Sequence, residues 1–210
     1  MPDSSLMHPD TALAAGPGVI EQALEHQLQR LLPTHHWLCR APSFKRKQQW
    51  FRRLLDETSH AVQLQDSVVR QPARPAPARP WARHLAVPTP PGTLADFAVT
   101  SWLLDSATPP AQPDSQAHPT FASACERIER RAIFHRRQAF ELLLAMTQKR
   151  QAGLGDQVQA AIDRQWPHLL ARLAGWPADE QQAFMARTLE QLQFLGCRAG
   201  TREAKGVAHG

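Results

Sequence analysis

Hydrophobic residues recur at helical spacing along most of this chain, and the clearest case is the segment 120–151. Its apolar side chains form one stripe about 100° wide on a helical wheel. A second apolar stripe appears only in the C-terminal half, which predicts deeper burial there, and Gly153 and Gly155 end the pattern. The main stripe consists of Phe121, Ala124, Cys125, Ile128, Ala132, His135, Ala139, Leu142, Leu143 and Met146.

Two further helices are predicted after this long one. We expect the first to be capped by Asp156 and to be kinked or split at Trp166, because Pro167 cannot donate a backbone hydrogen bond. The last begins at Pro177 and ends at Gly196, a residue type that favours helix ends. The short connections predict that residues 120–196 form an antiparallel bundle of three or four helices.

The N-terminal part predicts a helical hairpin over 18–69. Its first helix is expected to stop at Pro33, and its second to start near Ser43. On the second helix, Trp50 and Phe51 fall on a broad apolar arc that we expect to face the core.

Proline-rich and polar segments separate these units. Between them lies a short helix, 93–105, whose start Thr93 and Asp96 mark as a capping box. Proline fits neither a helix interior nor a central strand, so the segments around this helix are predicted to be flexible or disordered. Because these segments are long, the sequence leaves open whether the N-terminal hairpin packs on the bundle. These segments are 1–17, 70–92, 106–119 and the tail 197–210.

Composition supports an all-α fold. The chain of 210 residues has 18 prolines, 10 glycines and no tyrosine, and few of its residues are the β-branched and aromatic types that favour strands. No glycine-rich turn of the nucleotide-binding α/β type is present. The N-terminal sequence lacks the pattern of a secretory signal, no apolar run is long enough to span a bilayer, and three widely spaced cysteines make a poor disulfide framework. We therefore predict a cytoplasmic protein.

Basic residues give the chain a formal net charge of +5. The densest cluster is KRKQQWFRR, where five cations beside two aromatic residues could contact nucleic acid or an acidic partner. The alternative is an amphipathic helix whose cations only face water, and the helical wheel favours it. A further alternative is that part of the charge reflects GC-rich codon usage, which favours arginine over lysine, rather than a partner. The candidate contact residues are Lys45, Arg46, Lys47, Arg52 and Arg53.

A second group of charges lies on the long helix 120–151. Glu126 and Arg130 have the spacing of a helical ion pair, and such mixed faces usually form pairs of this kind. His135 lies inside the apolar stripe, where we expect a packed histidine with one satisfied nitrogen. The alternative for this helix is a partner-binding surface made of Arg127, Arg130, Arg131, Arg136 and Arg137.

No motif for catalysis or for a cofactor stands out. His35, His36 and Cys39 have spacings compatible with metal ligands, but the sequence shows no motif that supplies a fourth ligand. No spacing joins a cysteine, a histidine and a carboxylate into a catalytic group. We therefore predict no catalytic residues, no cofactor, no bound metal and no small-molecule substrate.

These observations predict a non-enzymatic helical adaptor that joins other proteins, or copies of itself, in a larger bacterial assembly. A secretion-apparatus accessory subunit or a chaperone would fit this description. The alternative is a basic helical nucleic-acid-binding protein, such as a regulator or a plasmid- or phage-associated factor, that uses the cluster from Lys45 to Arg53. Against this alternative, the sequence lacks a convincing helix-turn-helix motif, because prolines rather than a tight glycine turn separate its first two predicted helices.

Overall fold

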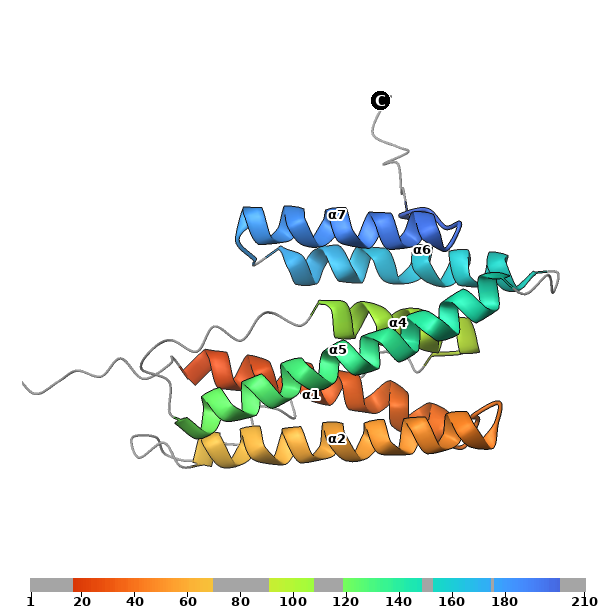
Figure 1. Cartoon of the computed structure of the whole chain (residues 1–210). Coiled ribbons are helices and arrows are strands. Elements are labelled where there is room, and N and C mark those ends of the chain that lie inside the picture. The colour runs from red at the N-terminus through yellow and green to blue at the C-terminus, as the bar shows by residue number, and fades with distance from the viewer. Residues whose placement is uncertain (1–16, 70–90, 108–118, 149–152, 175, 201–210) are drawn as a thin grey trace, which may run out of the picture.

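A computed structural model describes residues 17–69, 91–107, 119–148, 153–174 and 176–200, and within these ranges the regular structure is entirely helical. The all-α prediction is therefore confirmed. Most of the proline-rich segments, together with both chain ends, lie outside the described residues. Six helices are labelled in Figure 1: α1 (Pro17–Leu38), α2 (Phe44–Val69), α4 (Leu94–Ser106), α5 (Pro119–Gln148), α6 (Leu154–Leu173) and α7 (Ala178–Phe194).

The helices form layers, with α4 and α5 between the pair α1 and α2 and the pair α6 and α7 (Figure 1). Helix α4 contacts α1, α5 and α6, and helix α2 contacts α1 and α5. The N-terminal hairpin thus packs on the rest of the protein. After α7, the side-chain amide of Gln159 in α6 donates to the carbonyl of Arg198 at 3.0 Å and accepts from its N–H at 2.8 Å, which ties the C-terminal segment to α6.

Helix α4 is the most buried helix, although it is the shortest. Nine of its 13 residues are buried, and Trp102 is fully buried. Its sequence LADFAVTSWLLDS is apolar on almost every side, which is typical of a helix surrounded by others. Phe97 packs its ring against the rings of Trp37 and Trp50, at centroid distances of 5.7 and 4.6 Å. This helix therefore joins α1 and α2 to the main core.

The predicted capping box of α4 is confirmed. The Thr93 hydroxyl accepts from the Asp96 N–H at 3.1 Å, and the Asp96 carboxylate accepts from the Thr93 N–H at 3.0 Å. The same carboxylate forms an ion pair with Arg164 of α6. Burial opposes ionisation of Asp96, but the bonds from Arg164 and Thr93 hold its pKa below the ordinary value. The cap thus also fixes α4 against α6.

Several predicted helix ends are wrong. Helix α1 does not stop at Pro33 but continues to Leu38 with this proline inside it. Helix α6 runs through Pro167 to Leu173 without a break, and its N-cap is Gly153 rather than Asp156, which lies in the first turn. A proline removes only one backbone hydrogen bond, and packing of the surrounding helix can outweigh that loss. At α7, Pro177 is the N-cap rather than the first helical residue.

The C-terminal stop of α7 is confirmed. Gly196 adopts a φ of 71°, the left-handed region that favours glycine. Its N–H donates to the carbonyl of Gln193 at 2.9 Å, and the next N–H, of Cys197, donates to the carbonyl of Leu192 at 2.8 Å. These two bonds make a Schellman motif, which satisfies carbonyls that the helix end would leave unpaired.

The predicted core face of α2 is only partly confirmed. Trp50 is buried as expected, and Ala61 further along the apolar arc is buried too, but Phe51 is half exposed, as are Leu55 and Val62, at 50%, 54% and 52%. The stripe that faces α1, α4 and α5 is instead rich in polar side chains. Its buried residues are Trp50, Arg53, Glu57, His60, Ala61, Leu64 and Ser67.

Candidate functional site: a buried charged cluster

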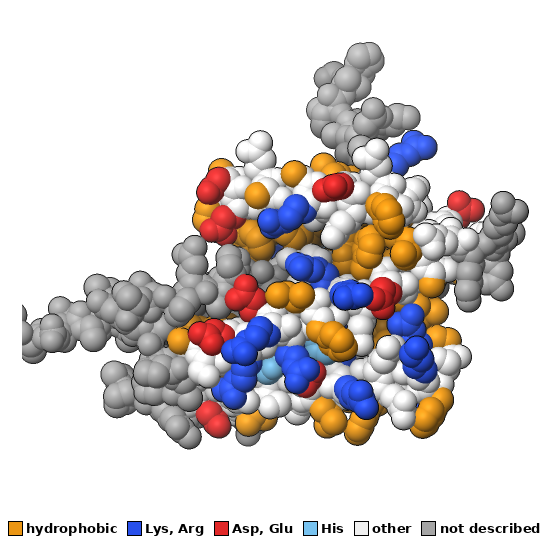
Figure 2. All heavy atoms as spheres, viewed as in Figure 1, with side chains coloured by type: hydrophobic (Ala, Val, Ile, Leu, Met, Phe, Trp, Pro, Cys, Tyr) orange, Lys and Arg blue, Asp and Glu red, His pale blue; other side chains and the backbone are white. Residues whose placement is uncertain are grey.

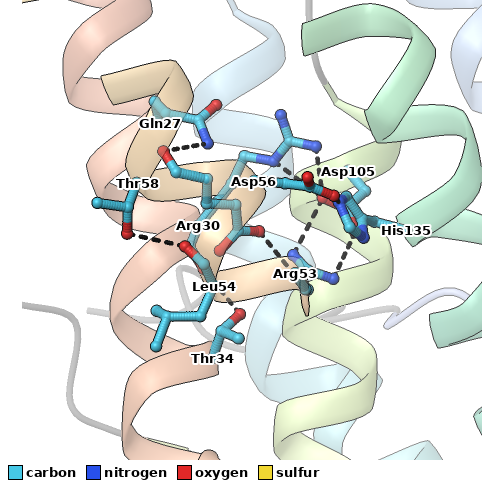
Figure 3. A network of polar contacts seen from close by, with 10 residues as sticks. Gln27, Arg30, Thr34, Arg53, Leu54, Asp56, Thr58, Asp105 and His135 are labelled. Atoms are coloured by element: carbon cyan, nitrogen blue, oxygen red, sulfur yellow. Dashed lines mark hydrogen bonds and ion pairs between the residues drawn. The ribbon is translucent and has the colours of Figure 1, made fainter. Parts of the chain in front are cut away.

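Charged side chains from three helices meet in the interior between α1, α2, α4 and α5 (Figure 3). Arg30 comes from α1, Arg53 and Glu57 from α2, and Asp105 from the last turn of α4. Each of these four residues is exposed by 4% or less. Buried charges of this kind are rare unless they are paired, so the cluster is the most distinctive chemical feature of the described residues.

Asp105 is the centre of the cluster. Its Oδ1 accepts from Nε and Nη2 of Arg30, at 2.9 and 2.6 Å. Its Oδ2 accepts from Nη1 of Arg53 at 2.8 Å, and Oδ1 also accepts from Nη2 of Arg53 at 3.1 Å. One carboxylate thus joins two guanidinium groups, and it links α4 to both helices of the N-terminal hairpin.

Glu57 supplies a second carboxylate. Its Oε1 accepts from Nε of Arg53 at 2.7 Å, one helical turn away, and its backbone carbonyl accepts from the side-chain amide of Gln27 at 3.3 Å. Burial raises the pKa of Glu57 to about 7, against the opposing effect of Arg53. Burial alone would lower the pKa of Arg53, but Asp105 and Glu57 raise it above its ordinary value. Arg53 therefore carries its charge at neutral pH.

Two histidines adjoin these charges. His60 lies one turn after Glu57 on α2, and His135 lies on α5. Burial lowers the pKa of His60 to about 4 and that of His135 to about 3, so both are neutral at pH 7. Nε2 of His135 lies 3.4 Å from an Asp56 oxygen, yet neither ring nitrogen forms a hydrogen bond within the protein. His135 is packed, as predicted, but the expected satisfied nitrogen is not found.

A small cavity borders the cluster at Trp50, Arg53 and His135. Its volume is about 10 Å³, which is at the lower limit for one water molecule. Within the described ranges, no group of three or more His, Cys, Asp or Glu side chains is arranged to hold a metal ion.

The residues of the first predicted contact cluster, Lys45 to Arg53, differ in their exposure to solvent. Lys45, Lys47 and Arg52 are exposed, and Arg46 is half-buried. Arg53 is not available to nucleic acid or to an acidic partner, because its guanidinium bonds to Asp105 and Glu57 inside the protein. That residue was assigned to the wrong face, since a single helix does not reveal where its neighbours pack.

The second predicted cluster lies on the outer face of α5. Four of its arginines are exposed, Arg136 is half-buried, and Figure 2 shows basic side chains gathered on the α2–α5 half of the face in view. The predicted pair of Glu126 and Arg130 is confirmed at 3.4 Å. No structural observation tests the role of these arginines as a partner-binding surface.

The sequence carried signals for the buried cluster that the helical wheel missed. Arg30 interrupts an apolar helix face, and Asp105 follows a strongly apolar run in α4. Glu57 and His60 form a Glu-x-x-His spacing, which places both side chains on one side of a helix. A charge within an otherwise apolar stripe is a sign of a buried ion pair.

Comparison with known proteins gives one informative similarity. The chain is 26% identical over 204 residues to one subunit of the 1,2-phenylacetyl-CoA epoxidase of Escherichia coli strain K12. The alignment covers 84% of this chain and 66% of the relative, so the chain spans about two thirds of the length of that protein. No protein-family model matches the chain.

This similarity corrects the function predicted from the sequence. The relative is a subunit of an enzyme that is named for a small-molecule thioester. The predictions of a non-enzymatic adaptor or nucleic-acid-binding protein, and of no small-molecule substrate, are therefore wrong. They failed because this chain shows no familiar catalytic spacing. The relative is itself one subunit of an enzyme. No helix in the described ranges has the length and apolar character to span a bilayer.

Proposed function

We propose that this chain is a subunit of a multi-subunit enzyme of the phenylacetyl-CoA epoxidase type, which acts on an aromatic acyl-CoA thioester. The observation that carries the proposal is the similarity to the Escherichia coli epoxidase protein over 84% of the chain. The all-helical architecture fits an enzyme that uses oxygen, because helical bundles are a common frame for such chemistry. Epoxidation adds one oxygen atom to a carbon–carbon double bond of the substrate.

The exposed arginines of α5 are the proposed contact surface for another subunit. Arg127, Arg130, Arg131 and Arg137 are solvent-exposed on one long helix. A row of guanidinium groups suits an acidic surface, since arginine forms forked hydrogen bonds with carboxylates. The exposed cations Lys45, Lys47 and Arg52 of α2 are a second candidate for such contacts. We place the enzyme in the cytoplasm, in keeping with the widely spaced cysteines, which are free thiols.

The proposal is tested by purifying the full chain with a tag, together with the proteins encoded beside it. The complex is incubated with phenylacetyl-CoA, dioxygen and an electron donor, and the acyl-CoA products are analysed by mass spectrometry. We expect a product that is heavier by one oxygen atom, and we expect its yield to fall when this chain is omitted. Acetyl-CoA, which has no aromatic ring, is the substrate control.

A binding measurement complements the turnover assay. We expect phenylacetyl-CoA to raise the melting temperature of the complex more than CoA alone does, because a ligand that binds the folded state stabilises it. The proposal fails if the chain purifies alone, does not associate with the neighbouring proteins and changes neither binding nor turnover when it is added back.

A further inference from the structure

Residues around the buried cluster follow the plan of a two-metal site in a four-helix bundle. In helical proteins that carry two iron or manganese ions, two helices each supply a glutamate and the other two each supply a Glu-x-x-His motif, all projecting inward. Here α2 carries Glu57 and His60 with that spacing, and both are buried. Helix α4 supplies the carboxylate of Asp105, and α5 supplies His135, which lines the same small cavity as Arg53.

The remaining positions depart from that plan. Three residues before His135, where the second motif would have a glutamate, α5 has the buried residue Ala132. Helix α1 presents the guanidinium of Arg30 to Asp105 instead of a carboxylate. Arg53 of α2 adds a second guanidinium, which bonds to both carboxylates. Two guanidinium groups thus lie among the carboxylates, whereas the plan has two metal ions there.

The carboxylate of Asp105 is already paired with two cationic side chains without a metal. Two guanidinium groups face the carboxylates of Asp105 and Glu57, and both oxygens of Asp105 already accept bonds of 3.1 Å or less. A divalent ion would need these same oxygens as ligands and would meet two fixed positive charges in an interior that screens them weakly. The donors that are present therefore do not fit a metal centre.

We infer that Arg30 and Arg53 replace the metal ions of a four-helix carboxylate site, so that this cluster is a metal-free core held together by ion pairs. The inference rests on the side chains alone and does not depend on the proposed epoxidase function. If both hold, the oxygen-activating group of the enzyme lies on another subunit or in a part of the chain outside this cluster.

The first test is the metal content of the full chain. The protein is produced in medium that contains iron and manganese, its tag is removed, and bound metal is measured by plasma mass spectrometry after dialysis. We expect far less than one ion per chain. Stoichiometric metal that is lost in a Glu57→Gln variant would overturn the inference, whereas metal that survives this substitution would lie elsewhere and leave the inference intact.

The second test rebuilds the missing ligands. A triple variant, Arg30→Glu, Arg53→Met and Ala132→Glu, removes the two guanidinium groups and completes the carboxylate set. We expect it to bind Co²⁺ roughly tenfold more tightly than the parent, or better, with a visible absorption band from the bound ion. A folded triple variant that binds no more Co²⁺ than the parent would contradict the assignment. If the variant fails to fold, the metal content of the parent still decides. Neither test uses substrate or turnover, so their outcome is separate from that of the proposed function.

Discussion

Replacing Asp105 with asparagine probes the central bond of the buried cluster. The carboxylate is 0% exposed and accepts from both Arg30 and Arg53. Asparagine has nearly the same shape, but it lacks the negative charge and offers only one acceptor oxygen. The substitution therefore leaves two buried guanidinium groups with Glu57 as the remaining carboxylate of the cluster.

The expected loss is large for a single substitution. Breaking a buried ion pair by removing one partner costs about 3–5 kcal/mol, because the remaining charge stays buried without compensation. In this protein one substitution uncouples two arginines, which are exposed by only 2% and 4%, so we expect the upper part of that range. For a chain of this size, such a loss lowers the melting temperature by roughly 10 °C or more.

Urea unfolding followed by circular dichroism measures the change. The matched control is Glu141→Gln, which removes a carboxylate from the solvent-exposed pair with Arg137. We expect this control to cost about 0.5 kcal/mol or less, since water screens exposed pairs. An Asp105→Asn protein whose free energy of unfolding stays within about 1 kcal/mol of the parent would refute the view that the cluster is a tightly coupled, desolvated unit.

Three other outcomes are expected. The pKa of Glu57 is raised from 4.5 to about 7, so between these pH values the folded state holds a proton that the unfolded state releases. As the pH rises through this range, the parent should therefore lose free energy of unfolding relative to the Glu57→Gln variant, which has no such proton. Urea titrations of both proteins at several pH values measure this difference. A pH-independent difference would contradict this. Gly196→Ala should cost about 1 kcal/mol in thermal unfolding because of its φ of 71°, whereas Gly155→Ala, inside α6 with open space around it, should be neutral or stabilising. Equal effects of the two alanines would contradict the argument. Arg127→Glu on α5 should weaken co-purification with neighbouring subunits, and Arg187→Glu on α7, where the arginine is also exposed, should not; identical recovery would remove α5 as the contact surface.

Local features of this protein were readable from the sequence. The helical spacing predicted the long helix α5 and the helices after it, the capping box at Thr93 marked the start of α4, and Gly196 marked the end of α7. Each of these depends on residues within a few positions of one another. Backbone geometry and short-range hydrogen bonds therefore fix them wherever the helix packs.

The buried cluster depends on tertiary structure. Arg30 and Asp105 are 75 residues apart and Arg53 and Asp105 are 52 apart, so no local pattern joins them. A helical wheel placed Arg53 in water because it ranks faces by hydrophobicity, and a charged residue faces the interior only when another helix brings its partner. The central position of α4 also depends on tertiary structure, because contacts with α1, α5 and α6 bury this helix. The sequence alone thus determines which segments are helical and those helix ends that have a local capping motif, as at Thr93 and Gly196. Packing decides whether a helix continues through a proline, as at Pro33 and Pro167, and which charges the helices enclose, because the desolvation of a charge is offset only by groups that folding brings together.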